Sequence, residues 1–201
     1  MAIEIEQPNL LVEGREEELF FEALIKYLGL QNIQIMPFGG KKNLRPFLKA
    51  LVMSPGFSEV ISLGVVRDAN RDPHGAFQSV HDALHAASLP VPNCPLTPFG
   101  ERPRVAVLIL PGSDRGGALE DLCLDAVAQD PSMRCVERYF KCLQKEGLSL
   151  PDNISKAKVQ VFLASRHKAG LRLGEAAQAG YWPWEAEAFG NVKDFLQRIF
   201  S

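Results

Sequence analysis

Residues 10–17 read LLVEGREE, and residues 65–72 read VVRDANRD. In each stretch an apolar run stops abruptly at carboxylates, as happens where a buried strand leaves the core of a sheet. A strand that is apolar on both faces is typical of the centre of a parallel sheet covered by helices on each side. The two stretches therefore predict an α/β fold with acidic residues at the carboxyl ends of two parallel strands.

Strand and helix patterns alternate around these two stretches. Strands are predicted at residues 9–12, 33–36, 59–67 and 104–110, and helices at residues 15–28, from the turn at 38–43 to about 52, from 73 to about 88, and from about 118. Such alternation predicts a mainly parallel four-stranded sheet flanked by helices. The Pro-rich segment 89–103 is predicted to be irregular or to form a hairpin.

The rest of the chain reads mainly as helix. Helices are predicted at residues 132–146, 154–165 and 187–200. We therefore divide the chain into an α/β domain at residues 8–130 and a helical C-terminal extension at residues 131–201 packed on it. Residues 159–163 alternate well enough to form a strand, so helix and strand both stay open there. Trp182 and Trp184 are predicted to pin the last helix onto the core, with base stacking as the alternative.

Charge and hydropathy limit the classes of partner. The chain has 201 residues and a formal net charge of −2, so binding to a phosphate polymer would need a local cluster of Lys and Arg. The sequence has no charged-then-apolar leader and no apolar run long enough to cross a bilayer. We therefore expect a cytoplasmic protein without a membrane partner.

The acidic residues fall where ligands bind in parallel sheets, in the crevice beyond the carboxyl ends of the strands. Glu13 and Asp68 end two predicted strands, and Glu17 heads the apolar stripe of the first helix. A carboxylate in that position is costly unless a cation or several donors compensate, although a helix N-terminus also favours negative charge. Because hard divalent cations take oxygen ligands, the three residues are candidate ligands for Mg²⁺ or Mn²⁺.

The fragment VEGREE at residues 12–17 resembles the opening of a Toprim domain of the kind found in OLD-family nucleases and in small uncharacterised Toprim-like proteins. The resemblance implies a Toprim-like fold in which Glu13 is a metal ligand or general base. It also implies that Asp68 is the first Asp of an Asp-x-Asp element, with Asn70 in the second place as a weaker ligand. Asn70 removes one negative charge from the pattern, which argues for one metal bound firmly and a second bound weakly, and against a two-metal mechanism. Asp72 could substitute, but an N-cap role is the plainer interpretation.

Two further parts of the resemblance concern later residues. Glu120, in the segment GGALED at residues 116–121, corresponds to a third acidic element. Lys156 or Lys158 stands roughly where OLD-type nucleases carry a catalytic lysine. The plain alternatives are a first-turn acid of a helix for Glu120 and a solvated helix face for the two lysines.

Two other motifs allow chemistry of their own. The turn FGGKKN at residues 38–43 is glycine-rich and enters a helix, so Gly40, Lys41 and Lys42 are candidates for binding a phosphate, although the P-loop spacing is absent. The segment HDALH at residues 81–85 differs by one residue from a zinc-protease motif. It lacks an evident third ligand, so a polar helix face is favoured.

Together these features predict metal-dependent phosphoryl transfer, in the first place hydrolysis of phosphodiester bonds in DNA or RNA. One alternative is a non-catalytic or partner-dependent Toprim-like module that relies on another protein. Another is a nucleotide-binding regulatory protein that uses the glycine–lysine turn. A free nuclease should carry a basic surface beside the acidic pocket, whereas a partner-dependent module should expose an apolar patch.

Overall fold

The protein is described by a computed structural model that covers residue 5, residues 9–112 and residues 114–201. Its centre is a parallel sheet with the strand order β2-β1-β3-β4. The strands are β1 (Asn9–Val12), β2 (Gln34–Pro37), β3 (Ser62–Asp68) and β4 (Arg104–Leu110). The predicted α/β class, with four parallel strands flanked by helices and a helical C-terminal part, is confirmed.

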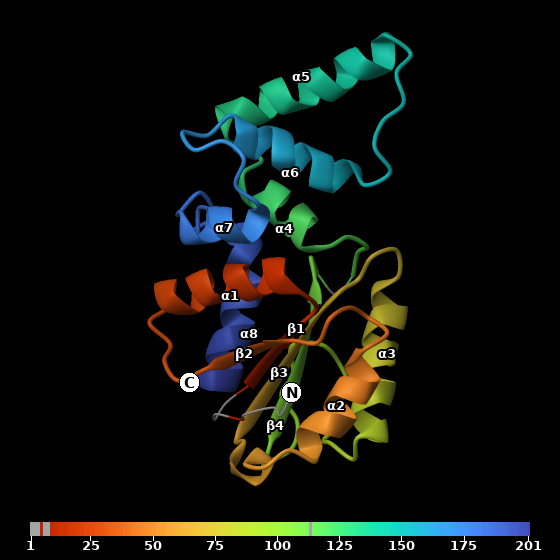
Figure 1. The fold of residues 1–201 in the computed structure, drawn as a ribbon, viewed down its shortest axis with the longest axis vertical. Coiled ribbons are helices and arrows are strands. Elements are labelled where there is room, and N and C mark those ends of the chain that lie inside the picture. Colours follow the sequence, from red (N-terminus) through yellow and green to blue (C-terminus); the bar gives the residue numbers. More distant parts are fainter. Residues whose placement is uncertain (1–4, 6–8, 113) are drawn as a thin grey trace.

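Helices cover both faces of the sheet. Helices α1 (Arg15–Tyr27) and α8 (Gly190–Phe200) lie on one face, and α2 (Leu44–Val52) and α3 (Pro73–Ala86) lie on the other (Figure 1). Because successive side chains of a strand point to opposite faces, each strand feeds two apolar cores. Leu10 thus belongs to the core under α1 and α8, and Leu11 belongs to the core under α2 and α3.

The third predicted strand begins later than the sequence pattern indicates. A 3₁₀ helix, η1 (Phe57–Glu59), precedes it, and β3 begins only at Ser62. Gly56 has a φ of +89°, which lets the chain turn sharply before η1. The strand prediction over 59–61 is therefore wrong. The Pro-rich segment 89–103 contains no helix or strand, only an isolated antiparallel bridge between Phe99 and Val105.

Four helices follow β4 before the last one. They are α4 (Leu119–Ala126), α5 (Pro131–Lys145), α6 (Ile154–Ala164) and α7 (Leu173–Gln178). The open question over residues 159–163 is settled as helix, and Asn153 caps α6 by accepting a hydrogen bond from the Lys156 amide at 2.9 Å. The short helix α7 was not predicted, nor was the 3₁₀ helix η2 (Glu187–Phe189) as an element separate from α8. Since α8 packs on β3 and β4, the end of the chain supplies part of the sheet's covering; the division at residue 130 stays a prediction.

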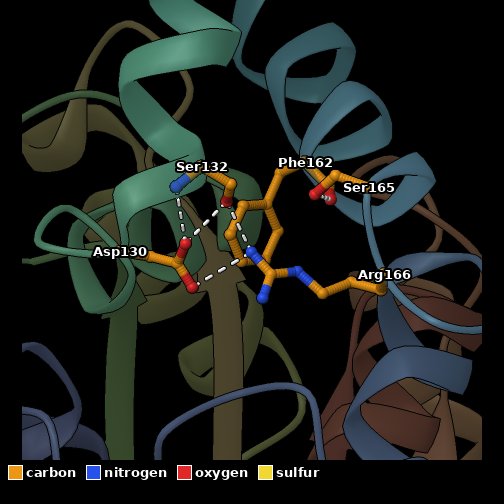
Figure 2. A network of polar contacts seen from close by, with 5 residues as sticks. All are labelled: Asp130, Ser132, Phe162, Ser165 and Arg166. Carbon is orange, nitrogen blue, oxygen red and sulfur yellow. Dashed lines mark hydrogen bonds and ion pairs between the residues drawn. The ribbon is translucent and has the colours of Figure 1, made fainter.

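Helices α5 and α6 form a hairpin at the carboxyl end of the sheet, and α5 is its outermost member (Figure 1). A polar network ties the start of α5 to the end of α6 (Figure 2). Asp130 caps α5 by accepting a hydrogen bond from the Ser132 amide at 2.8 Å. The guanidinium of Arg166 donates to Asp130 at 3.0 Å and to the Ser132 hydroxyl at 2.5 Å, while lying 4.0 Å above the Phe162 ring centroid.

The two tryptophans pack inside the molecule, as predicted. Trp182 stacks on Phe162 with ring centroids 5.8 Å apart, and its indole N–H donates to the Leu173 carbonyl at 3.1 Å. Trp184 meets Phe20 of α1 edge-on at 5.2 Å. Both are buried, so neither presents a face to a nucleic-acid base. Across the described ranges, no helix has the length and apolar character needed to cross a bilayer.

Candidate functional site

Two of the predicted acidic residues, Glu13 and Asp68, lie at the carboxyl edge of the sheet. Leu11 of β1 pairs in register with Val65 of β3, so Glu13, two residues further on, comes level with Arg67. Asp68 is the last residue of β3. The edge therefore places Glu13, Arg67 and Asp68 side by side where the two central strands end.

Asp68 carries the most strongly perturbed carboxylate of this edge. Its Oδ1 accepts a hydrogen bond from the Leu119 amide at the start of α4, at 3.2 Å. Burial, reinforced by the negative charges of Glu17, Glu13 and Glu120, raises the pKa of Asp68 to about 8. The single hydrogen bond from Leu119 opposes this shift only in part. The four predicted acids therefore act on one another electrostatically.

Glu17 lies in the first turn of α1, close to Glu13. Burial raises its pKa; backbone hydrogen bonds from its own amide and Gly14 offset part of that rise, whereas the charges of Glu13 and Glu120 add to it. A Cβ at Gly14 would lie 3.3 Å from Oε2 of Glu17, so the glycine leaves room for the carboxylate. Glu17 is therefore held among other acids and not on the solvated face of α1.

Arg67 is a member of the site that was not predicted. It is only 6% exposed, and its Nη1 donates to the Ser79 hydroxyl of α3 at 3.1 Å. Its Nε lies 3.9 Å from Oε2 of Glu13, and within the described part of the chain neither of these two buried atoms has a hydrogen-bond partner. The sequence signal was a charged residue inside the apolar run VVRD at residues 65–68.

The donor chemistry of this edge fits a hard divalent cation. Carboxylate oxygens are the preferred ligands of Mg²⁺ and Mn²⁺, and the unpartnered Oε2 of Glu13 and the destabilised charge of Asp68 are both groups that a cation would stabilise. The side chains are not gathered as a finished site, because the described residues contain no group of three or more His, Cys, Asp or Glu placed to hold a metal ion. This finding applies equally to the histidines of residues 81–85.

The glycine–lysine turn wraps around the end of β1. The amides of Gly39 and Gly40 donate to the Glu13 carbonyl at 3.1 and 2.9 Å, and the Lys41 amide donates to Oε1 of Glu13 at 3.2 Å. The Lys41 side chain lines a cavity of about 810 Å³ together with Arg67. Lys42 is exposed and does not line this cavity. The structure thus brings Lys41, but not Lys42, to the acidic edge.

The backbone conformation at position 70 explains why an Asn is found there. Its φ is +53°, a left-handed conformation that Asn tolerates better than most residues. Its amide donates to the Gly117 carbonyl at 2.7 Å and its side chain turns back to the Asp68 carbonyl at 3.4 Å. Asn70 lines the 810 Å³ cavity. Asp72 accepts a hydrogen bond from the Gly75 amide at 2.9 Å, which confirms its role as the N-cap of α3.

The two candidate lysines of α6 have different surroundings. Lys156 is exposed and lines a second cavity, of about 640 Å³, together with Glu120 and Glu16. Lys158 instead pairs with Glu137 of α5 at 2.7 Å. The geometry therefore associates Lys156 with the acidic edge and Lys158 with the α5–α6 hairpin.

Fold and site together define an α/β protein with a parallel sheet whose carboxyl edge carries a cluster of interacting carboxylates beside a buried arginine. The chain belongs to the DUF3226 family of proteins of unknown function, whose family model matches residues 7–201. Among solved structures it is similar to the hypothetical protein PH0156 from Pyrococcus horikoshii OT3, with 17% identity and a TM-score of 0.63 over 97% of this chain and 95% of the other. This likeness shows the fold alone. No curated protein matches the chain.

Proposed function

We propose that the protein is a Toprim-like, Mg²⁺- or Mn²⁺-dependent enzyme that hydrolyses phosphodiester bonds in DNA or RNA. The observation that carries the proposal is the buried Oε2 of Glu13, which has no hydrogen-bond partner among the described residues, next to the partly buried Asp68 at the ligand-binding edge of a parallel sheet. The neighbouring acids that help to raise the pKa of Asp68 to about 8 support it. A fold gains no stability from four mutually repelling acids in one place. A bound cation would offset their mutual repulsion and so account for their placement.

In this proposal Glu13 and Asp68 would hold the cation, with Glu17 and Glu120 beside them and Asn70 as a weaker neutral donor. A bound divalent cation supplies neutralisation of the charge that develops on phosphoryl oxygens. Hydrolysis adds water at phosphorus and breaks one P–O ester bond, leaving a phosphate on one product and a hydroxyl on the other. The protein's own part is to bind and orient the phosphate and to handle the proton of the attacking water.

In this proposal Arg67 and Lys41 would bind the substrate phosphate, and Lys156 would stabilise the leaving group. Arg67 is buried and held by Ser79, so its guanidinium is preorganised next to Glu13. Lys41 lines the same 810 Å³ cavity. Lys156 faces the cavity on the Glu120 side, where we assign it the role of stabilising the leaving group.

The proposal is tested by metal binding and cleavage on matched variants. Mn²⁺ binding is measured by calorimetry, and cleavage is measured on labelled single- and double-stranded DNA and RNA. We expect Asp68→Asn and Glu13→Gln to abolish Mn²⁺ binding and cleavage, since each removes a ligand charge while keeping shape. Asp194→Asn, the same change at an exposed residue of α8, should bind and cleave like the wild type. Equal Mn²⁺ binding in Asp68→Asn and the wild type would refute the site.

A second candidate function rests on a specific observation. The described residues contain no finished three-ligand group, and Asn70 lowers the negative charge of the Asp-x-Asp element. These features favour a non-catalytic or partner-dependent Toprim-like module, in which another protein completes the site. Such a module would bind Mn²⁺ weakly and would not cleave nucleic acid alone, which separates it from the enzyme in the same experiment.

A further inference from the structure

The outermost helix, α5, carries a row of cations on one face. They are Arg134, Arg138, Lys141 and Lys145, spaced four, three and four residues apart. Side chains with these spacings share one face of an α-helix. All four residues are exposed. At a rise of 1.5 Å per residue the row extends along about 16 Å of the helix.

The packing of α5 fixes the direction of this row. Its apolar residues Met133, Val136 and Phe140 are buried, and these lie on a different side of the helix from the cations. The Asp130–Arg166 network anchors the start of α5 on α6 (Figure 2). Helix α5 lies at the carboxyl end of the sheet (Figure 1), and its four cations are exposed to solvent there.

Arg134, Arg138 and Lys141 line a cavity of about 480 Å³ whose acidic residues are already neutralised. Of these acids, Glu137 pairs with Lys158 at 2.7 Å and Asp125 pairs with Arg115. Within the ranges that the structure describes, none of the three cavity cations has an acidic partner. We call the 480 Å³ cavity with these three cations the α5 groove.

We propose that the α5 groove binds the phosphate backbone of a nucleic acid. The net charge of the whole chain is −2, so three unpaired cations around one cavity are a local concentration and not part of a general basic field. Two of them are arginines, whose planar guanidinium matches phosphate oxygens in two places at once. A row of cations along a helix suits a partner whose anionic groups recur along a chain.

The α5 groove and the cavity at Glu120 lie on different sides of α6. Lys158 of α6 lines the α5 groove, while Lys156, two residues earlier on the same helix, lines the cavity at Glu120. The α5 groove is therefore a surface separate from the acidic edge. That the bound nucleic acid is also the substrate rests on the proposed function; binding in the α5 groove does not.

The test uses the full chain with Asp68→Asn and no divalent cation, so that cleavage cannot occur. Binding of a fluorescently labelled oligonucleotide, single-stranded or duplex, is followed by anisotropy over a range of salt concentrations. The variant Arg134→Ala/Arg138→Ala/Lys141→Ala should weaken binding by at least about tenfold and lower the slope of log K against log salt by about 3, one for each lost phosphate contact.

The matched control is Lys26→Ala/Lys49→Ala/Arg198→Ala, which removes the same charge from exposed residues of α1, α2 and α8. It should bind like the parent protein. Arg134→Lys/Arg138→Lys should keep the salt slope but lose part of the affinity, because Lys cannot contact a phosphate at two oxygens at once. An equal loss in both triple variants would show a net-charge effect and overturn the inference, as would competition by polyglutamate as effective as that by unlabelled oligonucleotide. If binding depends on the α5 groove but the wild type with Mn²⁺ does not cleave nucleic acid, the inference about the groove holds and the proposed enzymatic function is refuted.

Discussion

Asp68 at the edge of the sheet and Asp130 at the start of α5 are both shielded carboxylates, yet their surroundings have opposite effects. Burial and three neighbouring acids raise the pKa of Asp68 to about 8. Burial acts in the same sense on Asp130, but hydrogen bonds from Ser132 and Arg166 outweigh it and lower the pKa of that carboxyl (Figure 2). The negative charge around Asp68 is not compensated by its neighbours, whereas that of Asp130 is compensated by Arg166 and Ser132.

Under the proposed function, this contrast distinguishes a candidate metal site from a structural contact. The Asp130 network satisfies its carboxylate within the chain and stabilises a helix pair. The Asp68 cluster receives one backbone hydrogen bond on Asp68 and leaves Oε2 of Glu13 without a hydrogen-bond partner among the described residues. The proposed cation would compensate this charge repulsion.

The largest expected effect is on the pH dependence of stability. Between pH 3.8 and about 8 the folded protein holds a proton on Asp68 that the unfolded chain releases, so the free energy of unfolding should fall as the pH rises through this window. Each unit of pKa difference corresponds to about 1.4 kcal/mol, so the total fall is several kcal/mol. Asp68→Asn should remove this fall and make the protein more stable than the wild type near pH 8, as measured by urea unfolding.

The same measurement with Mn²⁺ sharpens the result. Saturating Mn²⁺ near pH 8 should raise the free energy of unfolding of the wild type, because a ligand of the folded state alone shifts the equilibrium. Asp68→Asn should not respond. If the wild type shows no pH-dependent loss relative to the variant, the carboxylate cluster is not under electrostatic strain, and the contrast with Asp130 disappears.

Arg166→Ala is expected to have the next largest effect. It removes a charged hydrogen-bond donor from Asp130 and a cation from the face of Phe162, which should destabilise the protein by about 1–3 kcal/mol. Because the pKa of Asp130 is lowered in the folded state, this stability is present above the ordinary value of 3.8 and lost as the pH falls below it. Urea unfolding should show the loss, while Mn²⁺ binding stays as in the wild type. A matching loss of Mn²⁺ affinity would mean that the two regions are coupled.

Much of the fold could be predicted from the sequence because its signals are local. The runs at residues 9–12 and 104–110 give β1 and β4 with their observed bounds, since unbroken apolar stretches mark buried parallel strands. The late start of β3 depends on the turn at Gly56, which periodicity does not report. The six-residue α7 is too short to show a helical pattern, and its burial against α1 comes from tertiary packing.

The candidate site likewise has features that the sequence predicts and features that it does not. That Glu13 and Asp68 share an edge followed from the rule that parallel strands end together. That Arg67 lies beside Glu13 depends on the register of β1 against β3, which the sequence does not state. That Lys158 pairs with Glu137, and Lys156 does not, likewise depends on the position of Glu137 on another helix.

Substitutions of Lys156 and Lys158 have the smallest expected effects on stability, and they distinguish the roles of the two lysines. The Lys158–Glu137 pair is partly exposed, with side-chain exposures of 25% and 44%, so Lys158→Ala should cost about 0.5 kcal/mol. It should leave the cleavage rate at saturating nucleic acid unchanged, because Lys158 lies away from the acidic edge. Lys156 has no ion pair among the described residues and faces the cavity at Glu120, so Lys156→Ala should leave stability unchanged and reduce cleavage by about a hundredfold or more. Urea unfolding and single-turnover cleavage on both variants measure the two quantities. The reverse outcome, with cleavage lost in Lys158→Ala, would move the catalytic lysine from the acidic edge to the hairpin.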